Sequence, residues 1–459
     1  MTDFVRKMMT GVGFMADTYD LFIINMVVEI MKDIYTISAF DETMIKVSAL
    51  LGSVVGQLFF GINADKIGRK KIFISTCLLT IFGSISSAIV GNTGAMSIAQ
   101  WLIFTRFFLG IGVGGEYPLS ATITAENEKV TNDEKITNLC TTFSMQGVGQ
   151  LLSGIVLIIA TQCIEDQNLQ WRLALAVGAL PMICSFYYRW TMDETFHFKK
   201  TQINGDKVNN PMIDNVSNID TENGNKNMDN TELEYLEKSK WDIFNDNLWQ
   251  IIGTGGTWFL LDIVFYANGL FSGTITKAMG TSDNNKSAAI QVFILQCISF
   301  PGYIVSIFLM AKQGPKYIQN QGFLAITFIF GIMAIFQHYL AQVSSLYIII
   351  YGLTFFFENY GANASTYVIP AITFPTEVRA TCHGISAAMG KMGAVFGVLV
   401  LLYMKNGFCQ GECDDDEDND AEKGLRLTFG FCAMVGIIGF FWSRALVSDK
   451  VHSSLHNVQ

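Results

Sequence analysis

Residues 44–91 read MIKVSALLGSVVGQLFFGINADKIGRKKIFISTCLLTIFGSISSAIVG, two apolar runs that flank a short basic loop. The runs cover 44–63 and 70–91, and a helix of about 20 residues spans roughly 30 Å, the thickness of the hydrocarbon core of a bilayer. Because the loop between the runs is short, the two helices must run in opposite directions. The stretch therefore predicts a pair of antiparallel membrane-spanning helices.

Similar runs recur on both sides of this stretch and predict twelve membrane-spanning helices in two sets. The first set lies near 8–31, 44–63, 70–91, 96–122, 136–161 and 170–190, and the second near 251–272, 288–311, 321–340, 344–372, 383–403 and 427–445. The segment between the sets is rich in Asn, Asp and Glu and lacks the large apolar residues that form a core. We therefore predict an all-α membrane protein with an N-terminal half at 1–192, a cytoplasmic linker at 193–247 and a C-terminal half at 248–459.

The composition of the 459-residue chain agrees with this architecture. Hydrophobic residues make up 50% of the chain and charged residues only 15%, well below the roughly 25% charged residues of a soluble globular protein. The net charge of −10 comes mostly from the polar segments, and no basic stripe for a nucleic acid is present. The sequence contains no nucleophile–base constellation, phosphate-cradling GxxxxGK[ST] loop or Cys/His metal spacing. We therefore expect neither an enzyme nor a cofactor.

Loop charges and repeated strings indicate the topology. Basic residues in the short loops favour a cytoplasmic location for both termini. GVGFMADTYD at 11–20 matches GTGGTWFLLD at 253–262 in its first and third glycines and its final Asp, and DKIGRK at 65–70 corresponds to AKQGPK at 311–316. These matches predict two pseudo-symmetric halves with a substrate site near the midplane between them.

Charged residues inside the predicted spans are the strongest indication of a functional site. A charge at the centre of a spanning helix costs at least ~3 kcal/mol on insertion scales, so it usually faces a cavity, a ligand or an opposite charge. An ion pair that only orients helices is the structural alternative. The residues are Asp17, Asp20, Arg106, Glu116, Asp262, Glu358 and Lys391.

Polar side chains on three predicted helices extend this set. Trp258, Asp262 and Tyr266 are spaced four residues apart, which places an indole, a carboxylate and a phenol on one helical face. Gln146 and Asn363 supply amides that either bind an anionic ligand or link helices. An unpaired carboxylate between two aromatic residues has no packing role, and this favours a binding site over simple packing.

Two motifs resemble those of a known transporter family. GINADKIGRKK at 61–71 is similar to the signature loop of the major facilitator superfamily, which it matches at Gly61, Asp65, Gly68 and Arg69. GGEYPLSATITAE at 114–126 resembles the hallmark of the phosphate:proton symporters of fungi and plants. The resemblance extends over all predicted helices, excluding the linker and the acidic loop near 414–420.

The resemblance implies a function and roles for individual residues. Carried onto matching positions, it implies phosphate contacts from Tyr117, Gln146, Trp258, Asp262, Tyr266 and Asn363, with Lys391 near the binding site. It also implies proton handling by Asp17 or Asp20 together with Arg106 and Glu116. The chain departs from the family pattern at Glu116, where the family has Asp, at Ala362, where it has Pro, and at an uncommon acid, Glu358.

These residues suggest two mechanistic hypotheses. Asp262 accepts a hydrogen bond from dihydrogen phosphate but repels sulfate, which carries no proton to donate at neutral pH. Glu116 alternates between protonation and an ion pair with Arg106 as the halves move. One proton with one dihydrogen phosphate is electroneutral, so use of the membrane potential requires a further proton.

Several alternatives stay open at this stage. A carrier of glycerophosphodiesters or of sugars would have the same fold, and a phosphate-sensing receptor would use the linker for signalling. Sodium instead of protons would also serve as the coupling ion. For a phosphate importer we expect the plasma membrane, with a vacuolar or endosomal membrane as the alternative.

Overall fold

The structure is a computed structural model that describes residues 3–91, 96–126, 130–195, 239–270, 272, 285–407 and 417–448. Most of the predicted linker, residues 196–238, lies outside this range. The described residues form helices and no strand. The helices are α1 (Asp3–Lys32), α2 (Ala39–Ile67), α3 (Arg69–Ala88), α4 (Ile98–Ala125), α5 (Asn132–Cys163), α6 (Gln167–Val177), α7 (Ala179–Thr191), α10 (Lys240–Asp246), α11 (Leu248–Leu270), α13 (Asn285–Gln313), α14 (Pro315–Ala341), α15 (Ser344–Phe357), η2 (Glu358–Asn363), α16 (Ala364–Thr373), α17 (Arg379–Gly407) and α18 (Glu417–Leu446).

The predicted membrane crossings correspond to these helices. Among the described residues, 11 helices or helix pairs are long and apolar enough to span a bilayer. The remaining predicted run, 344–372, consists of α15, η2 and α16, because a π-helical segment of 6 residues interrupts the α-helix. The sixth crossing is divided at Gly178 into α6 and α7. Together these elements account for the twelve predicted crossings.

Local sequence signals fix several helix ends. Ser97 and Thr131 form capping boxes that begin α4 and α5, and each satisfies backbone N–H groups that the helix itself leaves unpaired. Gly68 separates α2 from α3 with φ 116, and Gly314 precedes α14 with φ 91. These are the only positive-φ residues in the described part of the chain. Both lie in the repeated loop strings, so the repeat in sequence is also a repeat in backbone conformation.

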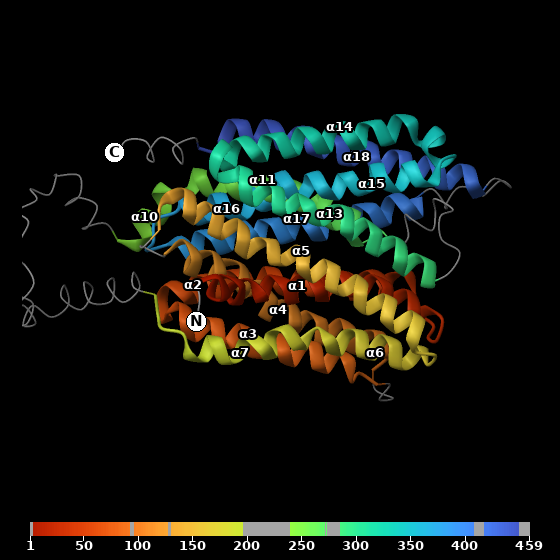
Figure 1. The fold of residues 1–459 in the computed structure, drawn as a ribbon, viewed down its shortest axis with the longest axis horizontal. Coiled ribbons are helices and arrows are strands. Elements are labelled where there is room, and N and C mark those ends of the chain that lie inside the picture. The colour runs from red at the N-terminus through yellow and green to blue at the C-terminus, as the bar shows by residue number, and fades with distance from the viewer. Residues whose placement is uncertain are drawn as a thin grey trace, which may run out of the picture.

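The helices pack into two halves of similar arrangement. Figure 1 shows α1 to α7 mainly in the lower part of the bundle and α11 to α18 mainly in the upper part. Within the first half α1 packs against α5 and α2 against α4; within the second half α11 packs against α17 and α13 against α15. These pairs occupy corresponding positions in the two halves, as the repeated strings predicted.

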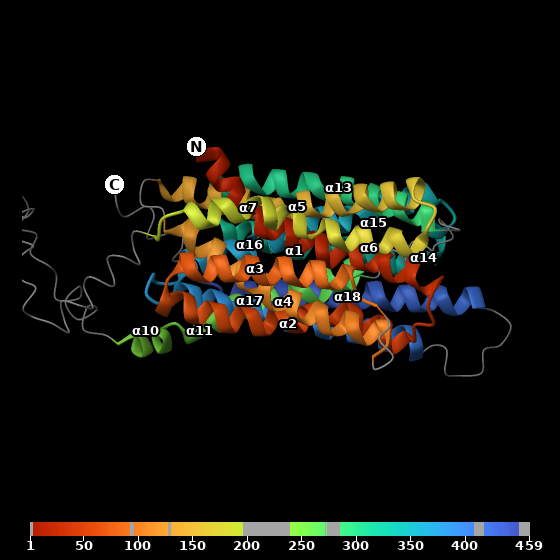
Figure 2. The ribbon, with the colours of Figure 1, turned by 90° about the horizontal axis from the view of Figure 1, so that it is seen from below.

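Two helix pairs form most of the interface between the halves. Helix α2 packs against α17, and α5 packs against α13; Figure 2 shows the second pair near the opposite face of the bundle from the first. The start of α1 and the end of α18 lie at the same end of the bundle, near α10 (Figure 1). Helix α4 also packs against α17, and α1 against α11, so residues carried by these four helices meet between the halves.

Candidate functional site

A buried lysine lies between two carboxylates and two phenols where four helices meet. The Lys391 ammonium donates hydrogen bonds to the hydroxyls of Tyr266, at 2.5 Å, and Tyr117, at 3.3 Å. Its Nζ is 3.6 Å from Oδ2 of Asp262. The Tyr117 hydroxyl in turn donates to Oδ2 of Asp17 at 2.6 Å. Helices α1, α4, α11 and α17 each contribute at least one of these side chains, which we call the Lys391 cluster: Asp17, Tyr117, Asp262, Tyr266 and Lys391.

The Lys391 ammonium also lies over both phenol rings. Nζ of Lys391 is 4.4 Å from the ring centre of Tyr266 and 4.6 Å from that of Tyr117, distances at which a cation is attracted to an aromatic face. The Trp258 ring lies 6.0 Å from the Tyr117 ring. The predicted face of Trp258, Asp262 and Tyr266 is thus buried against this cluster, and its side chains are no more than 1% exposed.

The two predicted amides also meet, from opposite halves of the molecule. The Asn363 amide donates to Oε1 of Gln146 at 3.0 Å, and the Tyr303 hydroxyl donates to the same oxygen at 3.1 Å. Oδ1 of Asn359 accepts a second hydrogen bond from Asn363 at 2.7 Å. Tyr303 belongs to the same buried cluster as Tyr117 and Trp258, so these amides adjoin the aromatic wall of the Lys391 cluster.

Sequence reasoning missed Tyr303 and Asn359. Asn359 is four residues before Asn363 and therefore on the same helical side, a spacing that was visible in the sequence. Tyr303 follows Pro301 and Gly302 in an apolar run, where nothing distinguishes it from a packing tyrosine. Only the contact between α5 and α13 identifies it as a partner of Gln146.

The predicted ion pair between Glu116 and Arg106 is wrong. Glu116 instead accepts from Arg189 through both oxygens, at 2.6 Å and 2.8 Å, and from the Thr76 hydroxyl at 2.7 Å. Positions 106 and 116 lie ten residues apart on one helix, so a rise of roughly 15 Å separates them. The partner comes from α7, a helix that had contributed no predicted site residue.

Arg106 lies near the other predicted proton-handling acid, Asp20. Nη2 of Arg106 donates to the Asp20 backbone carbonyl at 2.8 Å, and the Ser84 hydroxyl donates to Oδ2 of Asp20 at 2.9 Å. Asp20 and Arg106 are at most 1% exposed. The structure therefore separates the predicted proton-handling residues into three places: Asp17 in the Lys391 cluster, Asp20 beside Arg106, and Glu116 beside Arg189.

The signature loop joins the two halves at the end of the bundle where α10 lies. Oδ2 of Asp65 accepts from the backbone N–H and the hydroxyl of Thr381, at 2.8 Å and 2.7 Å. Arg69 pairs with Asp65 at 3.0 Å and with Glu126 at 2.9 Å. Its guanidinium also donates to the Thr376 carbonyl at 3.2 Å. Asp65 and Arg69 of the first half therefore bind directly to the loop before α17, at Thr376, and to the first turn of α17, at Thr381.

The two predicted glycines of this loop have different roles. Gly68 adopts φ 116 and ψ 152, a conformation that is nearly restricted to glycine. Gly61 allows α2 to approach α17 closely, because a Cβ there would lie 2.8 Å from the Ala380 carbonyl oxygen and 3.3 Å from Cα of Gly384.

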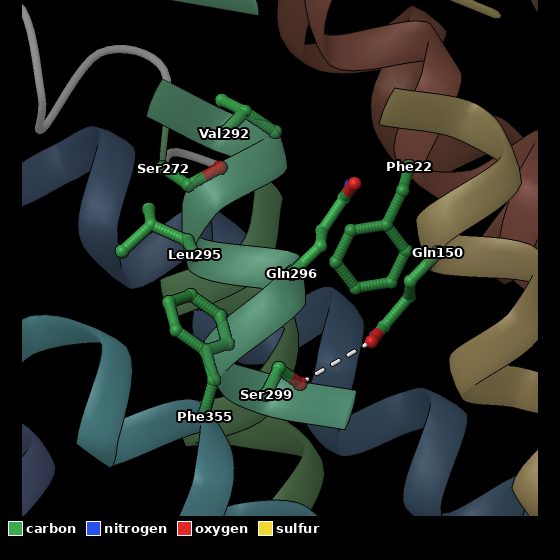
Figure 3. A pocket seen from close by; sticks show the side chains of 8 residues that line it. All are labelled: Phe22, Gln150, Ser272, Val292, Leu295, Gln296, Ser299 and Phe355. Carbon is green, nitrogen blue, oxygen red and sulfur yellow. Dashed lines mark hydrogen bonds between the residues drawn. The ribbon is translucent and has the colours of Figure 1, made fainter. Parts of the chain in front are cut away.

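Contacts on the far side of the Lys391 cluster also connect the halves. The Asn25 amide donates to the Gly269 carbonyl at 3.2 Å, and the Gln296 amide donates to the Ser153 hydroxyl at 3.2 Å. A cavity of about 20 Å³ lies beside them and is lined by Phe22, Gln150, Ser272, Val292, Leu295, Gln296, Ser299 and Phe355 (Figure 3). Its volume suffices for about one water molecule.

With the signature-loop contacts formed on one side and those of Asn25 and Gln296 formed on the other, the predicted binding residues between the halves are enclosed. Among the predicted binding residues the most exposed, Asn363, is only 3% exposed. The arrangement brings together a lysine, two phenols, an indole and two amides, which are groups that donate hydrogen bonds, with carboxyl groups beside them.

Comparison with known proteins identifies the family. Residues 8–456 match the sequence profile of the family described as "Sugar (and other) transporter". The chain is 31% identical to probable inorganic phosphate transporter 1-12 of Oryza sativa subsp. japonica, over 99% of this chain and 91% of that protein. It is 33% identical to probable inorganic phosphate transporter 1-7 of Arabidopsis thaliana, over 87% of this chain and 82% of the relative. The chain belongs to this transporter family.

Solved structures agree with the fold of the transporter. The proton:xylose symporter XylE bound to 6-bromo-6-deoxy-D-glucose superposes with a TM-score of 0.74 at 15% identity, over 96% of this chain and 95% of that one. A partially occluded inward open form of the xylose transporter from E. coli gives a TM-score of 0.69 at 14% identity, over 97% of this chain and 98% of the other. The transporter is thus a multi-pass membrane protein with the major facilitator fold, as the sequence predicted.

Proposed function

We propose that this transporter imports inorganic phosphate together with protons by alternating access. The observation that carries the proposal is the enclosed Lys391 cluster between the two halves, which unites a cation with hydrogen-bond donors and titratable carboxyls. The plant relatives named as inorganic phosphate transporters support phosphate as the substrate. In this proposal the protein is a carrier without a catalytic step or a cofactor, and the site residues bind and release their ligands unchanged.

Each side chain of the site has a role in recognising dihydrogen phosphate. Lys391 attracts the anion, and five neutral donors bind its oxygens: Tyr117, Gln146, Trp258, Tyr266 and Asn363. Asp262 accepts a hydrogen bond from a P–OH group, and such charge-assisted bonds are short and strong. Sulfate offers no proton at neutral pH, so Asp262 faces it as an unpaired negative charge and disfavours it.

The charges of the Lys391 cluster link phosphate binding to proton binding. Asp17 and Asp262 both lie near the single ammonium of Lys391. With both carboxylates ionised the cluster carries a net negative charge and opposes an incoming anion. Protonation of one carboxyl removes this repulsion, so the anion and the proton favour each other's binding. We assign Asp20 with Arg106, and Glu116, to the route by which protons reach or leave the centre.

In this proposal the linker 193–247 connects two halves, 1–192 and 248–459. Alternating access uses the two sets of contacts between these halves. On one side the contacts are those of the signature loop, Gly61, Asp65, Gly68 and Arg69, with α17. On the other side α1 and α5 contact α11 and α13 through Asn25 and Gln296. Release of either set exposes the site to that side, while the other set keeps the opposite side closed.

The proposal includes an orientation in the membrane. We assign the signature-loop end to the cytoplasm, with both termini, and the protein to the plasma membrane, where import of phosphate takes place. The location of α1's start and α18's end at one end of the bundle supports a common side for the termini (Figure 1).

Competition for uptake tests the substrate. Cells or vesicles that contain the transporter should take up labelled phosphate, and an excess of unlabelled phosphate should suppress the signal. Sulfate, glycerophosphocholine and xylose should leave it unchanged. Suppression by glycerophosphocholine would favour an organophosphate carrier, and suppression by xylose a sugar carrier. Reconstituted protein that binds phosphate but does not move it would favour a receptor.

A further inference from the structure

Glu358 is a fully buried carboxyl group that the proposed phosphate site does not use. It begins the π-helical segment η2 and is 0% exposed. Oε1 accepts one hydrogen bond, from the Asn268 amide at 3.2 Å. Oε2 has no hydrogen-bond partner within the described residues. A buried oxygen without a partner is costly if it carries charge.

The other buried carboxyls of the central region each lie beside a cation. Asp17 and Asp262 share Lys391, and Glu116 binds Arg189. Arg106 donates a hydrogen bond to the backbone carbonyl of Asp20, so its guanidinium lies beside this residue. Glu358 differs from all four, because among the described residues no cationic side chain interacts with it and its one hydrogen-bond donor is a neutral amide.

The groups around Glu358 do not supply a counter-charge either. Helices α11, α13, α14, α15 and α16 pack against η2. The titratable side chains that interact electrostatically with Glu358 are Tyr303 of α13, Tyr351 of α15 and Cys432 of α18. On α11, Asp262 and Tyr266 are directed to Lys391 instead. Phenols and a thiol are not cations, so the enclosed form of the protein favours a neutral, protonated Glu358.

Glu358 is also directly connected to the elements that hold the phosphate site. The next residue, Asn359, binds Asn363 through its side chain at 2.7 Å. Asn268, the partner of Glu358, follows Tyr266 by two residues on α11. One turn before Glu358 and Asn359, Phe355 lines the small cavity between the halves (Figure 3). π-helical segments are frequent at functional sites, and movement of η2 would affect Glu358 and Asn363 together.

We propose that Glu358 binds a second coupling proton, in addition to the proton taken up in the Lys391 cluster. This inference rests on the proposed phosphate–proton symport. Glu358 takes up its proton when the halves separate on the outer side, carries it through the enclosed state and releases it inside. Two protons with one dihydrogen phosphate move one net positive charge, so the membrane potential drives uptake.

The response to membrane potential tests this role. The purified protein is reconstituted into proteoliposomes, and a potassium diffusion potential, negative inside, is imposed at a constant pH gradient. Phosphate accumulation inside the proteoliposomes is then measured. One net charge should raise accumulation at equilibrium about 50-fold per 100 mV. We expect Glu358→Gln to retain accumulation driven by the pH gradient and to lose the response to potential. Glu358→Asp, which keeps a titratable group, and Glu165→Gln, which removes an exposed acid, should both retain the response.

The possible outcomes separate this inference from the proposed function. Absence of phosphate uptake by the unmodified protein contradicts the symport itself. Uptake that ignores potential in the unmodified protein, or an unchanged response in Glu358→Gln, contradicts only the role of Glu358. A sodium requirement that disappears in Glu358→Gln would show a sodium site instead. If Glu358→Gln does not fold, infrared spectra of the unmodified protein and of Glu358→Asp decide, because the band of a protonated carboxyl group at position 358 must shift between the two at neutral pH, and identical carboxyl bands would contradict the role.

Discussion

Asp262 is the residue on which the proposed choice between phosphate and sulfate depends. Its carboxylate lies 3.6 Å from the Lys391 ammonium and is 1% exposed. We predict that Asp262→Asn weakens discrimination, because the amide no longer repels an anion that lacks a proton. Competition of labelled phosphate uptake by sulfate measures the effect, and we expect a loss of about tenfold or more in selectivity, which corresponds to about 1.4 kcal/mol. Full phosphate uptake with unchanged exclusion of sulfate would contradict this role.

Arg189 and Glu116 form the most completely buried ion pair of the described residues near the centre. Both side chains are at most 1% exposed. Loss of one partner from a buried pair costs about 3–5 kcal/mol, because the other charge remains buried and unpaired. Arg189→Met should therefore lower thermal stability strongly, and Arg189→Met with Glu116→Gln should recover much of the loss. Thermal unfolding in detergent compares the variants, and a double variant no better than the single one would argue against the pair.

At the scale of elements, the turn between α2 and α3 depends on a glycine conformation. Gly68 has φ 116 and ψ 152, and Gly314 in the corresponding loop has φ 91 and ψ 139. A side chain in this region costs of order 1–3 kcal/mol. Gly68→Ala and Gly314→Ala should each reduce the free energy of unfolding by that amount. Gly424→Ala is the control, since a Cβ there meets nothing within 4 Å, and it should not destabilise the protein.

The sequence predicted elements better than the contacts between them. Runs of apolar residues determine where helices cross the membrane, and all twelve predicted runs correspond to described helices. The cost of burying charge also singled out Asp17 and Lys391 in the sequence, but as a proton-handling acid and a lysine near the binding site; that both contact Tyr117 is visible only in the structure. In contrast, the Glu116–Arg189 pair depends on how α7 packs against α1 and α3, which brings Arg189 to Glu116 of α4 and which helical spacing does not encode. The π-helical segment at 358–363 was likewise not predictable, because it depends on a shift in backbone hydrogen bonding rather than on hydrophobic periodicity.

At the scale of the whole molecule, closure of the signature-loop side requires close approach of α2 and α17. A side chain at position 61 would collide with the Ala380 carbonyl, 2.8 Å from the position of Cβ. We predict that Gly61→Leu holds this side open and abolishes net uptake. Cys382, which is fully buried on α17 in the closed arrangement, should then react faster with a maleimide.

A matched substitution controls for the added bulk. A Cβ at Gly331 meets nothing within 4 Å, so Gly331→Leu should leave both uptake and the reactivity of Cys382 unchanged. Equal reactivity of Cys382 in Gly61→Leu and in the unmodified protein would contradict the role assigned to this contact.

Phosphate uptake into proteoliposomes, with proton and sodium gradients imposed separately, tests the central claim most directly. If the enclosed Lys391 cluster couples phosphate to protons, an acidic exterior without sodium must drive accumulation above the external concentration. A proton ionophore must then abolish it. Accumulation that follows only the sodium gradient, or phosphate that never exceeds its external concentration under either gradient, would contradict proton-coupled phosphate import by this protein.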